Sequence, residues 1–272
     1  NSSTAHRVAS DKAATYELLN ANGVPALEHY VYLHPRYAKH LSKDGNWSEI
    51  AEKFETWGRD AVVKPNEGTG GIGIYRVRSN FELEHAVQEI LSSERSLSLS
   101  PFVTIKREIR VFILDNEILL AYEKYIPTVT ADGSSTIIEL MHQQLDADTV
   151  SLIFEGNIQT GSTINYQTIP AADEIVPIHW KHNLGLGAKP KFLETSSANA
   201  EITLALKAVR SIGLRFGSVD LIETDQGQLL VLEANSGVMM EKIAEYHPDG
   251  PKFLDKVYGA ALSQIFPNEV TR

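Results

Sequence analysis

Residues 217–237, GSVDLIETDQGQLLVLEANSG, constrain the fold most strongly, because they read as two β-strands joined by a tight turn. Val, Leu and Ile fill both halves, and the DQGQ cluster at residues 225–228 is typical of a turn between antiparallel strands. A two-residue loop at the centre of this cluster would place Asp220 directly opposite Glu233. The sequence therefore predicts a β-hairpin with two facing carboxylates.

A third oxygen donor joins these two carboxylates. Side chains alternate between the two faces of a strand, so Glu233 and Asn235 should share a face. Leu232 and Ala234 would then turn toward the packed side. Carboxylate and amide oxygens suit Mg²⁺ that arrives on a nucleotide phosphate. We therefore predict that Asp220 and its two neighbours bind metal, although a solvated acidic hairpin would give the same pattern.

Residues 61–78, AVVKPNEGTGGIGIYRVR, form the second informative pattern: a strand that ends in Lys64, a glycine-rich loop, and a second strand from about Ile74. The letters match GxGxxG, but a Rossmann turn continues directly into a helix, whereas IYRVR favours a strand. A Walker loop places its lysine after the last glycine, whereas Lys64 comes before the loop. The pattern instead predicts a flap whose backbone amides approach phosphate oxygens above Lys64. An ordinary hairpin loop is the alternative.

The composition limits the class of protein. The 272 residues can form one domain or two closely packed subdomains, and they contain no cysteine, no signal peptide and no apolar run long enough for a bilayer. These features predict a cytoplasmic protein without thiol catalysis, disulfides or a membrane partner. The net charge of -10 argues against general nucleic-acid binding.

Apolar residues at helical spacing predict several helices. Ser10 would cap a first helix, and Asn80 would precede another. Apolar faces at residues 202–212 and 253–265 predict two more, and Gly213 would end the former.

A strand lysine with a glycine flap, followed later by a hairpin with the D...ExN pattern, resembles the ATP-grasp superfamily of carboxylate–amine ligases. Residues 122–140, YEKYIPTVTADGSSTIIEL, are similar to the RVPxxVxGDGxxTIxEL stretch of cyanophycin synthetase and of the ATP-grasp part of bifunctional glutathione synthetase. The ending LEANSGVMMEKIAEYHPDG is similar to the EANxxPMMxxHxxP ending of the glutathione enzymes. The resemblance spans nearly the whole chain.

The resemblance implies an α+β protein with the ATP-grasp fold, in which two α+β subdomains clasp the nucleotide. Residues 1–100 would form the N-terminal subdomain with the flap, and residues 101–272 the C-terminal subdomain with the metal-binding hairpin. Most relatives carry a further domain before their DK motif. The sequence starts almost at that motif, so the pre-ATP-grasp domain is expected to be absent from it. Two interpretations fit: the chain is a fragment of a longer protein, or it is a stand-alone version whose substrate site is completed by a homodimer or a partner.

The resemblance also assigns roles to single residues. Nucleotide binding is expected of Lys12, Lys64, Gly70, Gly71, Phe102 and Glu108. Arg110 is expected to bind the acyl phosphate, and Lys124 is expected to be a second catalytic residue. Metal binding is expected of Asp220, Glu233 and Asn235. Lys124 stands where the family has the arginine of RVP. For Arg110, an internal ion pair with Glu108 is an equally good account.

Two segments depart from the family pattern. The hinge SLSLSPFVTIK has no acidic residue where relatives carry one, so adenine is expected to be held through backbone atoms. The RANxSTGG pattern of the family corresponds to HWKHNLGLG at residues 179–187, which keeps Asn183 but has His179 in place of the arginine.

The implied function is that of an enzyme, an ATP-dependent ligase that joins a small-molecule carboxylate to an amine through an acyl phosphate. Its substrates would be amino acids or short peptides. ATP and Mg²⁺ are the expected cofactors, with two metal ions and with Mn²⁺ as an alternative. Two other functions fit the same nucleotide site: phosphoryl transfer without amide formation, and a degenerate nucleotide-binding regulatory module.

Overall fold

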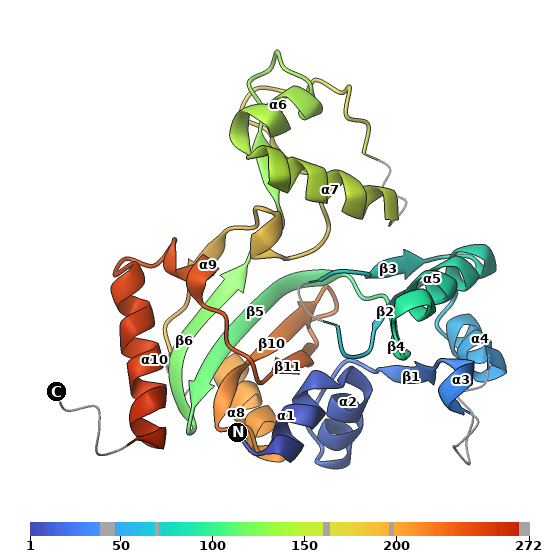
Figure 1. The fold of residues 1–272 in the computed structure, drawn as a ribbon. Coiled ribbons are helices and arrows are strands. Elements are labelled where there is room, and N and C mark those ends of the chain that lie inside the picture. The colour runs from blue at the N-terminus through green and yellow to red at the C-terminus, as the bar shows by residue number, and fades with distance from the viewer. Residues whose placement is uncertain (39–46, 69–70, 160–163, 196–198, 267–272) are drawn as a thin grey trace.

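The computed structural model describes residues 1–38, 47–68, 71–159, 164–195 and 199–266. Within these ranges the named strands form antiparallel sheets of four, five and two strands. In Figure 1 the four-stranded and five-stranded sheets lie beside each other, and the two-stranded sheet belongs to a smaller lobe above them. The predicted α+β class is confirmed.

The four-stranded sheet lies in the N-terminal part of the chain. Its strands, in spatial order, are β1 (Tyr30–Leu33), β4 (Ser96–Pro101), β2 (Ala61–Pro65) and β3 (Tyr75–Val77). The helices of this part are α3 (Pro35–Ala38), α4 (Trp47–Thr56) and α5 (Asn80–Ser93). On one face, Leu97 and Leu99 pack with Phe54 and Leu83 of two of these helices. Because strand side chains alternate, Lys64 at the end of β2 points to the opposite face.

The five-stranded sheet is the centre of the molecule. Its strands, in spatial order, are β11 (Leu229–Asn235), β10 (Phe216–Thr224), β5 (Ile105–Leu114), β6 (Glu117–Lys124) and β9 (Pro190–Phe192). The helices that cover it are α1 (Ser3–Ser10), α2 (Lys12–Ala21) and α8 (Ala200–Ile212) on one face, and α9 (Glu241–Ala244) and α10 (Pro251–Ile265) on the other. Leu19 and Val209 pack with Ile109 on the first face, and Phe253 packs with Phe112 on the second.

The packing of α1 and α2 shows that the start of the chain contributes to the core of the five-stranded sheet, although the four-stranded sheet follows it in sequence. Residues 102–104 connect the two sheets. The division of the chain into subdomains near residue 101 stays a prediction.

The helix starts correct two expectations by one residue each. The cap of α2 is Asp11, whose carboxylate accepts a hydrogen bond from Ala14 N at 2.8 Å, and not Ser10, which is the last residue of α1. The cap of α5 is Ser79, and Asn80 is the first helical residue. The later helices agree with the expected positions, and Gly213 ends α8 at φ 77°.

A third unit, the lobe at residues 127–187, rises above the two large sheets in Figure 1. It contains β7 (Thr128–Thr130), α6 (Ile137–Gln144), α7 (Ala147–Gln159), β8 (Ile175–Pro177) and the short helix η1 (Leu184–Leu186). Val129, Leu140, Ile153 and Ile178 form its own small core. Within the described residues, no helix has the length and apolar character needed to cross a bilayer.

Candidate functional site

The hairpin of β10 and β11 places Asp220 opposite Glu233, as the sequence predicts. Its turn differs from the expected one. Thr224 N donates a hydrogen bond to Gln228 O at 2.9 Å, so the loop holds three residues instead of two. Gly227 lies in this loop at φ 79°, a left-handed conformation that glycine adopts without strain.

A β-bulge restores the register that the longer loop would shift. Asp220 pairs with Glu233, but the next residue of β10 pairs with Val231, so Leu232 is an extra residue on β11. Val231 is buried in the core, and in a regular strand Glu233 would point the same way. The bulge therefore turns Glu233 to the other face. It also leaves Leu232 half-buried, which corrects the expectation that Leu232 packs in the core.

Asp220 is buried and ion-paired. Its carboxylate accepts hydrogen bonds from Arg110 Nε at 2.6 Å and Nη2 at 2.5 Å, and Lys124 Nζ lies 3.5 Å away. Burial alone would raise the pKa of Asp220, but the charges of Arg110 and Lys124 outweigh it and hold that pKa well below its usual range. Asp220 is therefore ionised at neutral pH, and two cations share its carboxylate.

Glu108 and Lys124 form a second buried ion pair on the same face. They lie opposite each other on β5 and β6, and their charged groups are in contact. Burial lowers the pKa of Lys124, but Asp220 and Glu108 raise it by more, so the ammonium stays charged. The alternative expectation of an ion pair between Arg110 and Glu108 is wrong, because each has another partner.

Lys64 and Lys12 approach Glu233 from β2 and from the first turn of α2. Lys64 is only 6% exposed and makes no hydrogen bond or ion pair with a described residue. Burial lowers the pKa of Lys64 to about 8, and the charge of Glu233 is the largest opposing effect. Burial also lowers the pKa of Lys12, again with Glu233 as the largest opposing charge. The side chains predicted for phosphate and for metal therefore share one electrostatic environment.

The described ends of the glycine loop are Gly68 and Gly71, and each lies close to a side chain from another part of the chain. Lys12 Nζ donates a hydrogen bond to Gly68 O at 2.7 Å. Gly71 has φ 76°, and a Cβ atom there would lie 3.0 Å from Asn183 Nδ2, so this position favours glycine for two reasons. Gly70, which was predicted to bind the nucleotide, lies outside the described residues.

Phe102 lies where the two large sheets are connected. Arg76 stacks on its ring at 3.4 Å from the centroid, and the ring of Trp180 meets it edge-on at 6.0 Å. Phe102 N donates a hydrogen bond to Asp60 O at 3.0 Å, and the side chain of Asp60 binds Arg76 through two hydrogen bonds. A cavity of about 190 Å³ adjoins Phe102 and is lined by Phe102, Val103, Thr104, Thr224, Asp225, Gln226 and Gln228.

His179 does not supply the positive charge of the arginine that the family pattern has in this segment. Its ring is buried, and its Nδ1 accepts a hydrogen bond from Lys181 N at 2.9 Å. Burial, together with the charge of Lys181, lowers the pKa of His179 to about 4, so the ring is neutral at pH 7. Lys181 carries the charge instead, and its Nζ donates to Gly71 O at 3.2 Å. The sequence analysis missed Lys181, although it is the lysine of the segment and precedes Asn183 by two positions.

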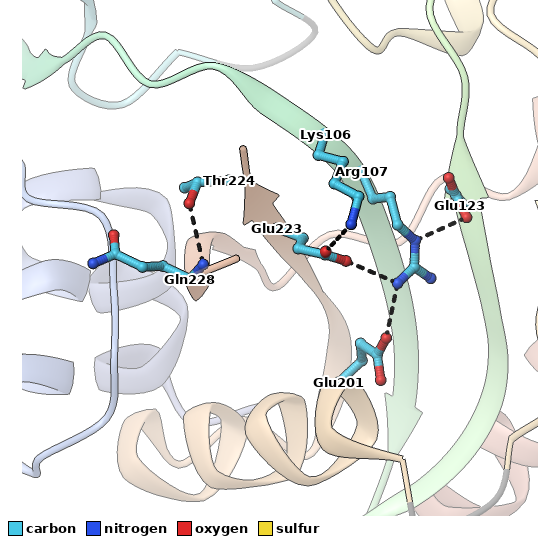
Figure 2. A network of polar contacts seen from close by, with 7 residues as sticks. All are labelled: Lys106, Arg107, Glu123, Glu201, Glu223, Thr224 and Gln228. Carbon is cyan, nitrogen blue, oxygen red and sulfur yellow. Dashed lines mark hydrogen bonds and ion pairs between the residues drawn. The ribbon is translucent and has the colours of Figure 1, made fainter. Parts of the chain in front are cut away.

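A separate ion-pair network, shown in Figure 2, lies on the other face of β5. The guanidinium of Arg107 contacts Glu123 at 3.2 Å, Glu201 at 3.2 Å and Glu223 at 3.1 Å. Lys106 Nζ donates to Glu223 at 2.7 Å. Because successive side chains of a strand point to opposite faces, this network joins β5, β6, β10 and α8 away from the candidate site.

Two sequence comparisons support the resemblance. Residues 162–248 match the RimK-like ATP-grasp domain family. Cyanophycin synthetase of Trichormus variabilis is 26% identical over 287 aligned positions, which cover 96% of this chain and 30% of that protein. The glutathione biosynthesis bifunctional protein of Mannheimia succiniciproducens is 23% identical and is aligned over 67% of this chain and 27% of that protein. The chain thus spans less than a third of either relative.

The fold comparison agrees with the sequence comparisons. D-alanine–D-alanine ligase from Bacillus anthracis superposes with a TM-score of 0.58 at 15% sequence identity, over 95% of this chain and 69% of that chain. At this level of identity the similarity concerns the fold alone. The fold comparison shows that the chain has the ATP-grasp fold, and residues 162–248 are similar to the RimK-like ATP-grasp domain.

Proposed function

We propose that this chain provides the nucleotide site of an ATP-dependent ligase that joins a small-molecule carboxylate to an amine through an acyl phosphate. The observation that carries the proposal is the shared electrostatic environment of Lys12, Lys64 and Glu233. One buried and one half-buried ammonium group, neither hydrogen-bonded to a described carboxylate and both stabilised by the charge of Glu233, match the charges of a metal-bearing triphosphate.

The proposed reaction balances without a protein nucleophile. A carboxylate oxygen of the acid attacks the γ-phosphorus of ATP, the bond from that phosphorus to the β–γ bridging oxygen breaks, and ADP leaves. The amine nitrogen then attacks the acyl carbon, inorganic phosphate leaves, and the nitrogen loses a proton. The charges of Lys12 and Lys64 reduce the repulsion between the two anions that meet in the first step.

Arg110 and Lys124 have different parts in this proposal because their exposure differs. The side chain of Arg110 is 26% exposed and is proposed to contact the acyl phosphate. The side chain of Lys124 is only 6% exposed, and it is proposed to act by holding Glu108 and Asp220 in place. Glu108 is proposed to bind the ribose, and Phe102 the adenine through its backbone.

The oxygen donors of the hairpin fit Mg²⁺. Glu233 and Asn235 are both half-buried, and Asn235 Nδ2 donates to Glu233 Oε1 at 3.3 Å. In the described part of the chain, no three His, Asp or Glu side chains form a metal site by themselves, so phosphate oxygens are proposed to complete the coordination. Bound between Glu233, Asn235 and Asp220, the metal would neutralise phosphate charge.

The substrate class is proposed from the names of the relatives. One structural relative is a D-alanine–D-alanine ligase, and one sequence relative belongs to glutathione biosynthesis. We therefore propose an amino acid or a short peptide as the acid and as the amine.

The experiment that tests the proposed function is a screen for Mg²⁺-dependent ADP release with pooled amino acids and short γ-glutamyl peptides. Active pools are then resolved by mass spectrometry of the products. An amide product supports the proposal. A phosphorylated acceptor without an amide would replace it with phosphoryl transfer, and ATP binding without turnover in every pool would replace it with a regulatory module.

A further inference from the structure

Lys181 is a cation near the glycine loop that no motif had marked. It lies between β8 and η1, in the last part of the lobe at residues 127–187. Its Nζ donates a hydrogen bond to Gly71 O at 3.2 Å and lies 5.8 Å from the centroid of the Trp180 ring. Lys12 holds the other end of the same loop through Gly68 O. Two lysines from distant parts of the sequence thus reach the described ends of one loop.

Lys181 differs from the paired cations of the five-stranded sheet. Arg110, Lys124 and Arg107 each contact at least one carboxylate. In contrast, no described carboxylate forms a hydrogen bond or an ion pair with Lys181, whose ammonium donates to the backbone carbonyl of Gly71. Burial is the cause that lowers the pKa of Lys181 to about 8. A half-buried ammonium with so weak a partner is costly for the protein, unless an anion from outside the chain binds it.

The position of Lys181 beside the glycine loop indicates that the anion is a phosphoryl group. Its ammonium is at the Gly71 end of the loop, whereas Lys12 is at the Gly68 end. A phosphoryl oxygen placed at the loop would accept a stronger, charge-assisted hydrogen bond than the carbonyl of Gly71 does. The aromatic contact of Trp180 with Phe102 ties the segment of Lys181 to the connection between the two sheets, which fixes the backbone that carries the ammonium.

We propose that Lys181 is a third phosphate-binding lysine of this site, and that its ammonium exchanges Gly71 O for an oxygen of the terminal phosphate of the nucleotide. The proposal rests on the proposed function, because it requires a nucleoside triphosphate beside the glycine loop. It adds a residue that discriminates a triphosphate from a diphosphate.

The test measures the affinity of the wild-type chain and of Lys181 variants for two probes by isothermal titration calorimetry. The probes are Mg²⁺ with ADP, and Mg²⁺ with the ATP analogue that has an imido group between the β- and γ-phosphates. Lys181→Met should weaken binding of the analogue by about 10- to 100-fold, the loss of one hydrogen bond to a charged group. The same variant should bind ADP within about threefold of wild type, and Lys181→Arg should retain most of the affinity for the analogue.

Lys189→Met is the matched control, because Lys189 is an exposed lysine shortly after the same segment. It should bind both probes as the wild type does. Thermal unfolding without ligand separates binding from folding. Lys181→Met removes a poorly paired, half-buried charge, so its Tm should equal or exceed that of the wild type.

Three results would overturn the proposal. Equal affinity of Lys181→Met and wild type for the analogue would show that Lys181 does not contact phosphate. An equal loss for ADP and the analogue would place the contact on an inner phosphate, and a loss for Lys189→Met as large as that for Lys181→Met would show a general effect of surface charge. In all three cases, binding of the analogue by the wild type keeps the proposed function intact, whereas no binding of either probe by the wild type would contradict both.

Discussion

Arg110 donates hydrogen bonds to both carboxylate oxygens of Asp220, at 2.6 and 2.5 Å, across the neighbouring strands β5 and β10. One residue was predicted to bind an anion and the other a metal, yet in the structure they neutralise each other. Lys64 of the four-stranded sheet and Glu233 of β11 form no ion pair with a described residue. The candidate site therefore has one part whose charged side chains are paired with each other and another part whose charged side chains are available to a ligand.

Glu233→Gln tests the unpaired part. This change keeps the size of the side chain but removes the charge that balances Lys12 and Lys64, so Mg²⁺-dependent ADP release should fall by at least about 100-fold. The measurement is ADP release with saturating ATP and the substrates found in the screen. Glu117→Gln, at the exposed start of β6 and outside the cavity beside Phe102, is the control and should retain full activity. Near-normal ADP release by Glu233→Gln would remove the metal role of the hairpin.

Asp220→Asn tests the paired part through stability. Removing the carboxylate leaves the half-buried Arg110 and the buried Lys124 without this partner, which should lower the free energy of unfolding at pH 7 by about 3–5 kcal/mol. Urea unfolding at several pH values is the measurement. Asp225→Asn, at the exposed turn, should change the free energy of unfolding little.

The loss caused by Asp220→Asn should also depend on pH. The pKa of Asp220 in the folded chain is depressed below its ordinary value of 3.8. The stability that this carboxylate contributes is therefore present above about pH 4 and is lost as the pH falls toward the folded pKa. The difference between wild type and Asp220→Asn should narrow below pH 4. A difference that stays constant down to pH 2 would contradict the ion pair.

Nucleotide affinity should fall at alkaline pH because of Lys64. Its pKa of about 8 belongs to the ligand-free chain, and a bound phosphate favours the protonated form. Affinity for the imido analogue should stay level below about pH 8 and fall by up to tenfold per pH unit above it. The charged and titratable groups that act on Lys64 are Lys12, His29, Glu108, Asp220 and Glu233. Lys64→Arg, which stays protonated, should show a shallower decline, and identical pH profiles would rule out Lys64 as a ligand.

Arg107→Met tests whether the network of Figure 2 is separate from the nucleotide site. The change leaves Glu123, which is 8% exposed, without its cation and should destabilise the fold by about 1–3 kcal/mol. Affinity for ADP should not change, because Arg107 points away from the face that carries Arg110. Urea unfolding and calorimetry on the same samples measure the two effects. A large loss of ADP affinity at unchanged stability would show that the two faces are coupled.

The residues proposed for the candidate site, apart from Lys181, were predicted from the sequence, but the way in which the chain brings them together was not. Alternation along the strands correctly predicted Asp220 opposite Glu233. That prediction assumed a two-residue loop and a regular strand, whereas the chain has a three-residue loop and a bulge at Leu232. The extra residue in the loop and the extra residue in the bulge shift the pairing in opposite directions, so Asp220 still lies opposite Glu233. Strand periodicity carries no information about a bulge, because one extra residue leaves the apolar pattern on both sides intact.

Contacts between residues far apart in the sequence were the second feature that could not be predicted from the sequence. Local periodicity predicted the helix that begins near Lys12, but it could not show that this helix packs on the five-stranded sheet, together with α8. The lobe at residues 127–187 was not predicted as a unit, because its short strands give weak patterns. Lys181 was missed because its surroundings depend on long-range packing. A lysine becomes a candidate ligand only when the fold buries it without a carboxylate, and that property does not exist in the sequence.

A crystal structure of the chain with Mg²⁺ and the imido analogue of ATP would test the central claim most directly. The account predicts a metal ion about 2.0–2.1 Å from an oxygen of Glu233 and from Asn235 Oδ1. It also predicts phosphate oxygens within about 2.7–3.2 Å of the Nζ atoms of Lys64 and Lys181. An analogue bound elsewhere on the chain, with Lys64 and Glu233 in contact with no ligand atom, would contradict it.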